Sequence, residues 1–254
     1  MKKITSVMMV VICTSVFSQV SIASLETEVN TRLIKNNLTT TSGETTSVLP
    51  STSVATLIPF LQKGKYGYKS QSGKVVIKPI YNNVCFFADD CRILNSPNEK
   101  IREFGSSQFA SVQINGVDYR IDDKGQLVYK LKESELGICP SSYQHQKYLV
   151  YKFKNSYGLI EYDHYTEDGN KQIFKIPPQY EMIHVMESED RENPMLIATK
   201  NDKFGIIDIN NNIIVPFEYM DIKRNFSWKL GHLFEVSKDG KHFYYIDSSN
   251  KAYK

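Results

Sequence analysis

The chain has no long apolar run beyond its first two dozen residues, and its charges nearly cancel. It carries 31 Lys and Arg against 28 Asp and Glu, and the basic residues are scattered among the acids. A nucleic-acid-binding protein needs a basic face, so the composition argues against nucleic acid as a partner. A helix that spans a membrane needs about 20 apolar residues, so we expect no membrane span in the mature protein.

Familiar catalytic and metal-binding motifs are also missing. GxSxG, HExxH, GxxxxGK[ST] and CxxC do not occur. The segment Ser248–Lys251 fits SxxK, but it falls in a predicted turn and not at the start of a buried helix. His184 and Glu187 stand three apart in a predicted strand, so they should point to opposite sides. The acidic segment 163–168 lacks EF-hand spacing and is predicted to be a solvated hairpin tip. We therefore expect no cofactor and no metal site.

The N-terminus has the order of parts of a secretory signal peptide. Lys2 and Lys3 precede a mostly apolar run from Val7 to Val20, and Ser21-Ile22-Ala23 then supplies small residues for cleavage. The run is too short and too polar for a membrane anchor. Residues 1–23 are therefore predicted to be a signal peptide, and the mature chain to be exported to the periplasm or outside the cell.

The remaining chain divides by composition. Residues 24–56 are rich in Ser and Thr and predict a flexible leader. From residue 57 to residue 254, aromatic and β-branched residues dominate, and about 200 residues are enough for one well-buried domain.

Three cysteines follow the predicted cleavage site, and an exported protein permits disulfides. Cys85 and Cys91 flank a short loop, so they are the expected pair, which leaves Cys139 as a free thiol.

The domain repeats itself. "KYGYKSQSGKVVIKPIY" (Lys65 to Tyr81) and "KFGIIDINNNIIVPFEY" (Lys203 to Tyr219) share an aromatic-glycine pair, a turn, a β-branched run, a proline and a final tyrosine. A third copy, Ser156 to Tyr180, carries eight extra residues in its middle. Two degenerate copies begin at Asn115 and Asp239, which makes about four to five units, the last one truncated.

The shared positions of the three best copies are candidate structural residues. They are Tyr66, Gly67, Pro79 and Tyr81; Tyr157, Gly158, Pro178 and Tyr180; and Phe204, Gly205, Pro216 and Tyr219. We expect the aromatic to point inward, the glycine to allow close backbone approach, and the proline to end a strand at a sheet edge. The tyrosine should bury its ring and place its hydroxyl on a backbone group.

The turns between these positions are typical of connections between β-strands. Asn115-Gly116, Asp239-Gly240 and Asp168-Gly169 are predicted two-residue hairpin turns. A second turn recurs with a residue that tolerates positive φ at one place, namely Gly73, Gly125, Asn211 or Asn250. The sequence thus predicts an all-β fold of tandem antiparallel hairpin or meander repeats, either an open array or propeller-like.

This pattern resembles the WG (KWG) repeat of bacteria from about Leu57 to Lys254. The resemblance is strong in the units at Lys65, Ser156 and Lys203, although none keeps the family's tryptophan, and Trp228 lies between motifs. It implies a β scaffold with no activity attached to the motif.

Three functions remain open. The favoured one is an exported, non-enzymatic repeat scaffold that binds another protein or an envelope polymer through its outer faces and loops. The second is an enzyme whose site is assembled from dispersed residues, for which the candidates are His145, His164, His184, His232 and His242. The third is a structural component of the cell envelope. The long hairpin around residues 164–168 and the loop 187–193 differ most between units, so they are the expected binding surfaces.

Overall fold

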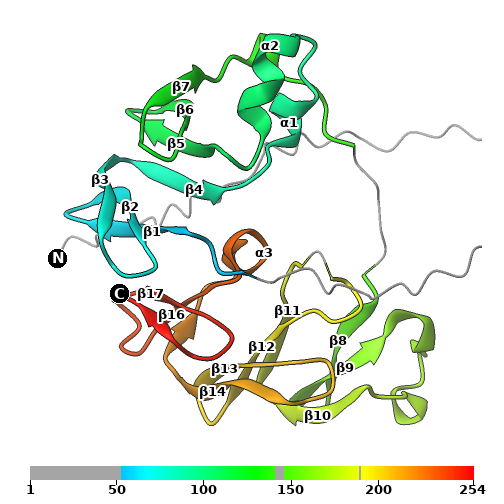
Figure 1. The fold of residues 1–254 in the computed structure, drawn as a ribbon. Helices are drawn as coiled ribbons and strands as arrows, with labels where there is room; N and C mark the ends of the chain where they lie inside the picture. Colours follow the sequence, from blue (N-terminus) through cyan, green and yellow to red (C-terminus); the bar gives the residue numbers. More distant parts are fainter. Residues whose placement is uncertain (1–52, 141–145, 189) are drawn as a thin grey trace, which may run out of the picture. The chain divides into compact units, whose positions relative to one another are not determined.

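The computed structural model describes residues 53–140, 146–188 and 190–254. The predicted signal peptide and almost all of the predicted leader, as well as His145, lie outside these residues. The described part is mostly β and consists of small antiparallel sheets in tandem, as the sequence predicts (Figure 1). Its helices are all too short or too polar to cross a membrane.

Five sheets, A to E, follow one another along the described chain, and each is a meander of consecutive strands. Sheet A contains β1 (Leu57–Gln62), β2 (Lys65–Ser70) and β3 (Val75–Tyr81). Sheet B contains β4 (Asn83–Phe87), β5 (Ala110–Ile114), β6 (Val117–Ile121) and β7 (Leu127–Lys130). Sheet C contains β8 (Tyr148–Phe153), β9 (Ser156–Glu161) and β10 (Ile176–Tyr180). Sheet D contains β11 (Met182–Val185), β12 (Leu196–Lys200), β13 (Lys203–Ile207) and β14 (Ile213–Tyr219). Sheet E contains β15 (Asp221–Ile222), β16 (Phe234–Ser237), β17 (Tyr244–Ile246) and β18 (Ala252–Tyr253).

Short helices occupy the connections. Those beside sheet B are α1 (Cys91–Leu94), α2 (Glu99–Arg102), η1 (Glu103–Gly105) and η2 (Glu133–Glu135). Two 3₁₀ turns, η3 (Tyr162–His164) and η4 (Gly169–Lys171), follow β9, and α3 (Ser227–Gly231) precedes β16.

The hairpin turns follow the sequence only in part. Asn115 and Gly116 have φ of 49° and 79°, which confirms the turn between β5 and β6. The predictions for Asp239-Gly240 and Asp168-Gly169 are wrong. In both segments the aspartate carboxylate accepts hydrogen bonds from nearby backbone N–H groups, which favours a different turn. Asp239 binds the N–H groups of residues 241 and 242, both at 2.8 Å, and Asp168 caps the first residues of η4.

The second turn in sheets A, B, D and E is built as the sequence predicts. Its left-handed residues are Gly73, Gly125, Asn211 and Asn250, with φ of 84°, 81°, 67° and 62°. In sheets B, D and E an aspartate stands three residues earlier and ties the turn together. Asp208 Oδ1, for example, accepts hydrogen bonds from the N–H groups of Asn210 and Asn212, both at 2.8 Å. The SxxK serine, Ser248, lies in the corresponding turn of sheet E, between β17 and β18.

The hydrophobic core is divided among the contacts between sheets. One cluster joins sheets A and B, a second joins C and D, and a third joins D and E. In each of these pairs only one residue separates the last strand of one sheet from the first strand of the next, so sequential sheets pack together.

Sheet E also packs against sheet A, although the two are far apart in the sequence. Ile58 of β1 shares a core cluster with Leu233 and Tyr253. Lys69 is almost fully buried, and its Nζ donates a hydrogen bond to the carbonyl oxygen of Tyr253 at 3.3 Å; burial lowers the pKa of this lysine. The run of sheets A–B and the run C–D–E are therefore joined at the contact between E and A.

The expected Cys85–Cys91 disulfide is wrong, because Cys91 is bonded to Cys139. Cys85 is not a free thiol either. The reason lies in the helices beside sheet B. The segment after η2 folds back on α1, where the Gly137 N–H donates to the Arg92 carbonyl oxygen at 2.7 Å. This contact brings the Cα atoms of Cys91 and Cys139 within 5.3 Å.

Candidate functional site

The glycine of the repeat motif lies against the backbone of the neighbouring strand. A Cβ atom on Gly67 would lie 2.5 Å from the Ile77 carbonyl oxygen and 2.8 Å from the Pro79 nitrogen. On Gly158 it would lie 2.5 Å from the Ile176 oxygen, and on Gly205 it would lie 2.9 Å from the Val215 oxygen. The close approach occurs because the third strand bulges over the glycine at the proline.

The other motif residues differ from their expected roles in detail. Tyr66, Tyr157 and Phe204 are only half-buried at the side of the core, while the residue after each glycine is fully buried. Pro79, Pro178 and Pro216 lie in the edge strands β3, β10 and β14, as expected for a residue without N–H. They do not end these strands, which continue to the tyrosine.

The tyrosine fastens one unit to the next. Tyr81 donates a hydrogen bond to the Gly125 carbonyl oxygen at 3.2 Å, which is the expected backbone partner. Tyr180 and Tyr219 instead donate to the side-chain oxygens of Asn211 and Asn250, at 2.7 and 2.6 Å. These partners are the left-handed residues of the following unit's second turn. The motif residues are thus occupied with holding the fold.

A different set of residues forms a hollow at sheet C. The two segments that depart most from the repeat, 162–175 and 187–195, approach each other there. The hollow has a volume of about 380 Å³ and is lined by Gln146, Lys147, Glu161, Tyr162, Asp163 and Glu192.

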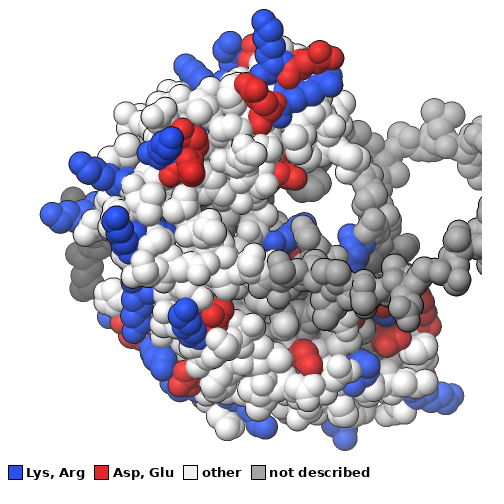
Figure 2. Space-filling model, in the orientation of Figure 1, with Lys and Arg blue, Asp and Glu red and all other residues white. Residues whose placement is uncertain are grey.

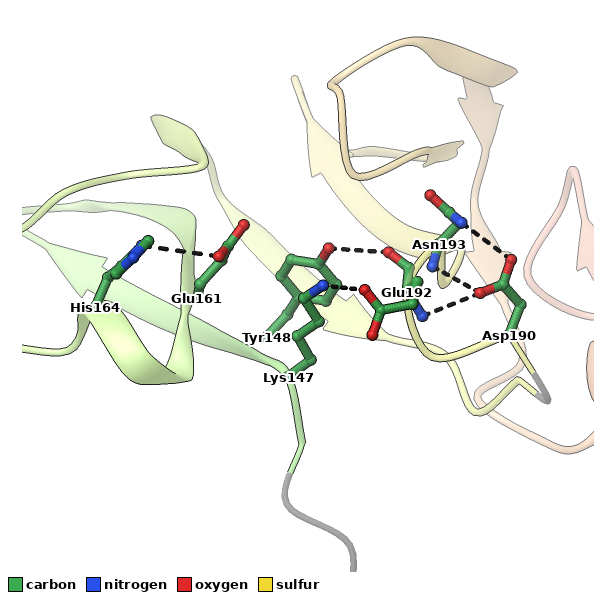
Figure 3. A network of polar contacts seen from close by, with 7 residues as sticks. All are labelled: Lys147, Tyr148, Glu161, His164, Asp190, Glu192 and Asn193. Carbon is green, nitrogen blue, oxygen red and sulfur yellow. Dashed lines mark hydrogen bonds and ion pairs between the residues drawn. The ribbon is translucent and has the colours of Figure 1, made fainter. Parts of the chain in front are cut away.

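Polar contacts hold the two sides of the hollow together (Figure 3). Lys147 forms an ion pair with Glu192, and this contact raises the pKa of Lys147. The Tyr148 hydroxyl donates to the Glu192 carbonyl oxygen at 2.9 Å, and burial raises the pKa of Tyr148. Asp190 accepts hydrogen bonds from the N–H groups of Glu192 and Asn193, both at 3.0 Å. The hydrogen bond from the Asn193 side chain lowers the pKa of Asp190.

The insertion 162–175 is ordered by one buried amide. Gln172 is 8% exposed; its Oε1 accepts from the Thr166 N–H at 3.1 Å, and its Nε2 donates to the His164 carbonyl oxygen at 3.0 Å. The Tyr151 ring of β8 contacts the rings of Tyr165 and Phe174, with centroids 6.5 and 5.8 Å apart. The hydrogen bonds of Gln172 therefore order the insertion, and the ring contacts of Tyr151 fix it to the sheet.

This fixed insertion exposes large apolar side chains. Tyr162, Tyr165 and Ile173 are 45%, 54% and 65% exposed. A second hollow of about 200 Å³ adjoins the first at Glu161 and is lined by Ile173, Phe174, His164 and Lys175. Exposed apolar groups beside polar hollows are typical of interaction surfaces. We call the surface formed by residues 146–148, 161–175 and 190–193 the insertion face.

The four described histidines have separate surroundings. His164 Nδ1 is 3.8 Å from Glu161, and His242 Nδ1 is 2.6 Å from Asp239. His184 is half-buried, and burial together with nearby Arg224 lowers its pKa. His232 packs edge-on against the Trp228 ring. The described residues contain no group of three or more His, Cys, Asp or Glu that could hold a metal ion. In the view of Figure 2, Lys and Arg are interspersed with Asp and Glu.

The fold and these surfaces define a tandem β-repeat protein. Its repeated residues stabilise the scaffold, and the segments that depart from the repeat form an additional surface on it. A model of one family, the WG containing repeat, matches residues 66–91 and 204–241. These two segments of the chain are therefore similar to the WG containing repeat. A search of curated proteins gave no significant match.

Proposed function

We propose that this protein is an exported, non-enzymatic β-repeat scaffold that binds another macromolecule through the insertion face. The binding partner is a protein or an envelope polymer, and binding takes place at the cell envelope or outside the cell. One observation carries the proposal: the two segments that depart from the repeat lie at the same face and line the same hollow.

The energetics of this face support binding. Ile173 and Tyr165 leave apolar surface in water, and covering such surface contributes roughly 25 cal/mol for each Å² removed from water. The face is also pre-ordered, because Gln172 and the contacts of Asp190 fix its two segments. A partner therefore meets a surface whose ordering entropy is already lost, which favours affinity.

The proposal is tested by partner capture with matched variants. Mature protein, immobilised through its C-terminus, is exposed to envelope and culture fractions and to purified envelope polysaccharide. Ile173→Ser alters the insertion face, and Ile213→Ser alters a side chain of similar exposure, 61%, at the start of β14. We expect Ile173→Ser to reduce retention of the partner at least tenfold and Ile213→Ser to leave it unchanged.

Equal retention by both variants would place binding on another surface, and no retention by wild-type protein from any fraction would refute the binding function. Export is tested separately by N-terminal sequencing of the protein from these fractions. We expect the chain to begin at Ser24, and an intact Met1 would refute export by a cleaved signal peptide.

A further inference from the structure

Sheets A and C have three strands, whereas sheets B, D and E have four. The additional strand of a four-stranded sheet is β4, β11 or β15. Each begins two residues after the tyrosine that ends the preceding unit, so the preceding unit supplies it. No strand immediately precedes β1 or β8 among the described residues. Within the described part of the chain, their outer edges are therefore the places where the repeat has no additional strand.

The hairpin register shows which backbone groups of β8 face this edge. Phe153 and Ser156 close the hairpin, and at its far end the Tyr162 N–H donates to the Lys147 carbonyl oxygen at 2.7 Å. Bonded residues alternate along an antiparallel pair. Leu149 and Tyr151 therefore bond to β9, while the N–H and C=O groups of Tyr148, Val150 and Lys152 point toward the free edge.

Sheet D shows what occupies the equivalent edge. The motif glycine pairs with Tyr151 in sheet C and with Ala198 in sheet D, so Val150 corresponds to Ile197. Ile197 is paired with His184 of β11. The strand β11 thus occupies in sheet D the position that no strand of the described residues takes beside β8.

Sheet A shows how such an edge is closed when no strand is added. There the motif glycine pairs with Phe60, so the residue equivalent to Val150 is Pro59. Proline has no N–H, and a proline in an edge strand blocks pairing with a further strand. The strand β8 has no proline, and its Val150 side chain is 37% exposed. Of these two edges, β1 is blocked at its centre, whereas β8 has no proline and no strand of the described residues beside it.

We propose that the free edge of β8 binds an extended segment of a partner protein as an added antiparallel strand, in the position that β11 has in sheet D. This inference rests on the proposed binding function and specifies the partner as a polypeptide strand. Recognition by strand addition derives affinity from main-chain hydrogen bonds and specificity from alternate side chains.

The neighbouring surface indicates the chemistry of that strand. One face of the added strand would lie beside Tyr151 and the exposed ring of Tyr165, which favours apolar side chains at alternate positions. An antiparallel strand would end at Tyr148, next to the hollow that contains Glu161 and Asp163. Asp163 makes no ion pair with the described residues. A lysine or arginine after the apolar residues of the partner strand would therefore be favoured.

The probe is a synthetic peptide with the sequence of residues 180–187, which includes the chain's own β11, with two lysines added at its C-terminus. Binding is measured by titration calorimetry, and the Val150 amide is followed by hydrogen exchange in the isotope-labelled protein. We expect rapid exchange of this amide in the free protein and at least tenfold slower exchange with saturating peptide. Val150→Pro removes the outward N–H and should weaken binding at least tenfold, whereas Val150→Thr keeps it and should bind normally.

Val150→Pro should still fold, because the hydrogen bonds to β9 come from the residues on either side. Lys152→Pro removes another outward N–H and replaces Val150→Pro if that variant does not fold. Unchanged peptide binding by the folded proline variant would overturn the inference. So would a Val150 amide already protected in the free protein, whether residues 24–52 or a second copy of the chain cover it. Deletion of residues 24–52 and sedimentation at two concentrations identify which one does so.

Partner capture separates this inference from the proposed function. If wild-type protein and the proline variant retain the partner equally, strand addition is refuted and the binding function stands. If wild-type protein retains nothing, the binding function is refuted, and peptide binding alone would decide whether the edge accepts a strand.

Discussion

Replacing Gly67 with alanine should destabilise the protein far more than the addition of one methyl group ordinarily does. The added Cβ would lie 2.5 Å from the Ile77 oxygen and 2.8 Å from both the Lys78 carbonyl carbon and the Pro79 nitrogen. All three are backbone atoms, so no side chain can rotate to relieve the contact. The bulge of β3 would have to move away from β2.

The magnitude follows from what this movement disrupts. Overpacking a well-filled site costs about 1–3 kcal/mol, and each strand hydrogen bond that is weakened adds up to about 1 kcal/mol. We expect Gly67→Ala to lower the free energy of unfolding by about 3–4 kcal/mol. The control is Gly116→Ala at a hairpin turn, where no atom lies within 4 Å of the new Cβ. Its φ of 79° is unfavourable for alanine and should cost roughly 1–2 kcal/mol.

Urea denaturation of both variants, with the disulfides intact, measures this difference. The reasoning predicts a smaller effect for Gly205→Ala, because the nearest backbone atom is 2.9 Å from its Cβ. If Gly67→Ala lost no more stability than Gly116→Ala, close packing of the bulge against the motif glycine would not be the reason for that glycine.

Three further predictions concern other contacts. Tyr219→Phe should cost about 1 kcal/mol through its lost hydrogen bond to Asn250; in a double-mutant cycle with Asn250→Gly, which preserves the turn, additive losses would exclude this coupling. Removing the Cys91–Cys139 disulfide, which closes a separation of 48 residues, should cost up to about 4 kcal/mol in thermal melts, and a non-reduced peptide map that lacks this pair would refute the assignment. Burial raises the pKa of Glu235, so the folded state retains its proton after the unfolded state has lost it at its ordinary value of 4.5. The contribution of Glu235 to stability should therefore fall as pH rises above 4.5. Glu235→Gln, compared with wild type by urea denaturation at pH 4 and 7, should shift the stability difference between the two pH values in favour of pH 7; an identical pH dependence of the two proteins would contradict this.

The sequence predicts most of the scaffold because its signals are local. The positive φ of Asn211 and the aspartate that caps its turn act within five residues, so a short window contains the information. The role of the motif glycine is equally predictable, because the glycine stands at the same position of the motif in each of the three best copies. The hairpin predicted at Asp168-Gly169 fails for a related reason: its aspartate carboxylate competes for the same backbone groups.

The disulfide and the insertion face depend on long-range contacts, which a short window does not contain. Cys139 bonds to Cys91, 48 residues earlier in the sequence, because the segment after η2 folds against α1. The hollow at sheet C brings Glu161 and Glu192 together from two units. The divergence of those two segments from the repeat is the sequence signal that drew attention to them. The contact between them was not predictable from spacing.

The runs A–B and C–D–E end at sheets that are covered to different degrees, and this difference supports the binding proposal. Repeat proteins need a cap where stacking stops. At sheet B, the helices cover Tyr129 and Val128 of β7, and the Cys91–Cys139 disulfide holds the covering segment in place. At sheet A, Pro59 blocks the edge and sheet E covers the core. At sheet C, the described residues include neither a proline in β8 nor an added strand, and the insertion beside it exposes apolar side chains. An open strand edge promotes aggregation unless a partner covers it. The described surface at sheet C is therefore the place where a partner strand would complete the repeat.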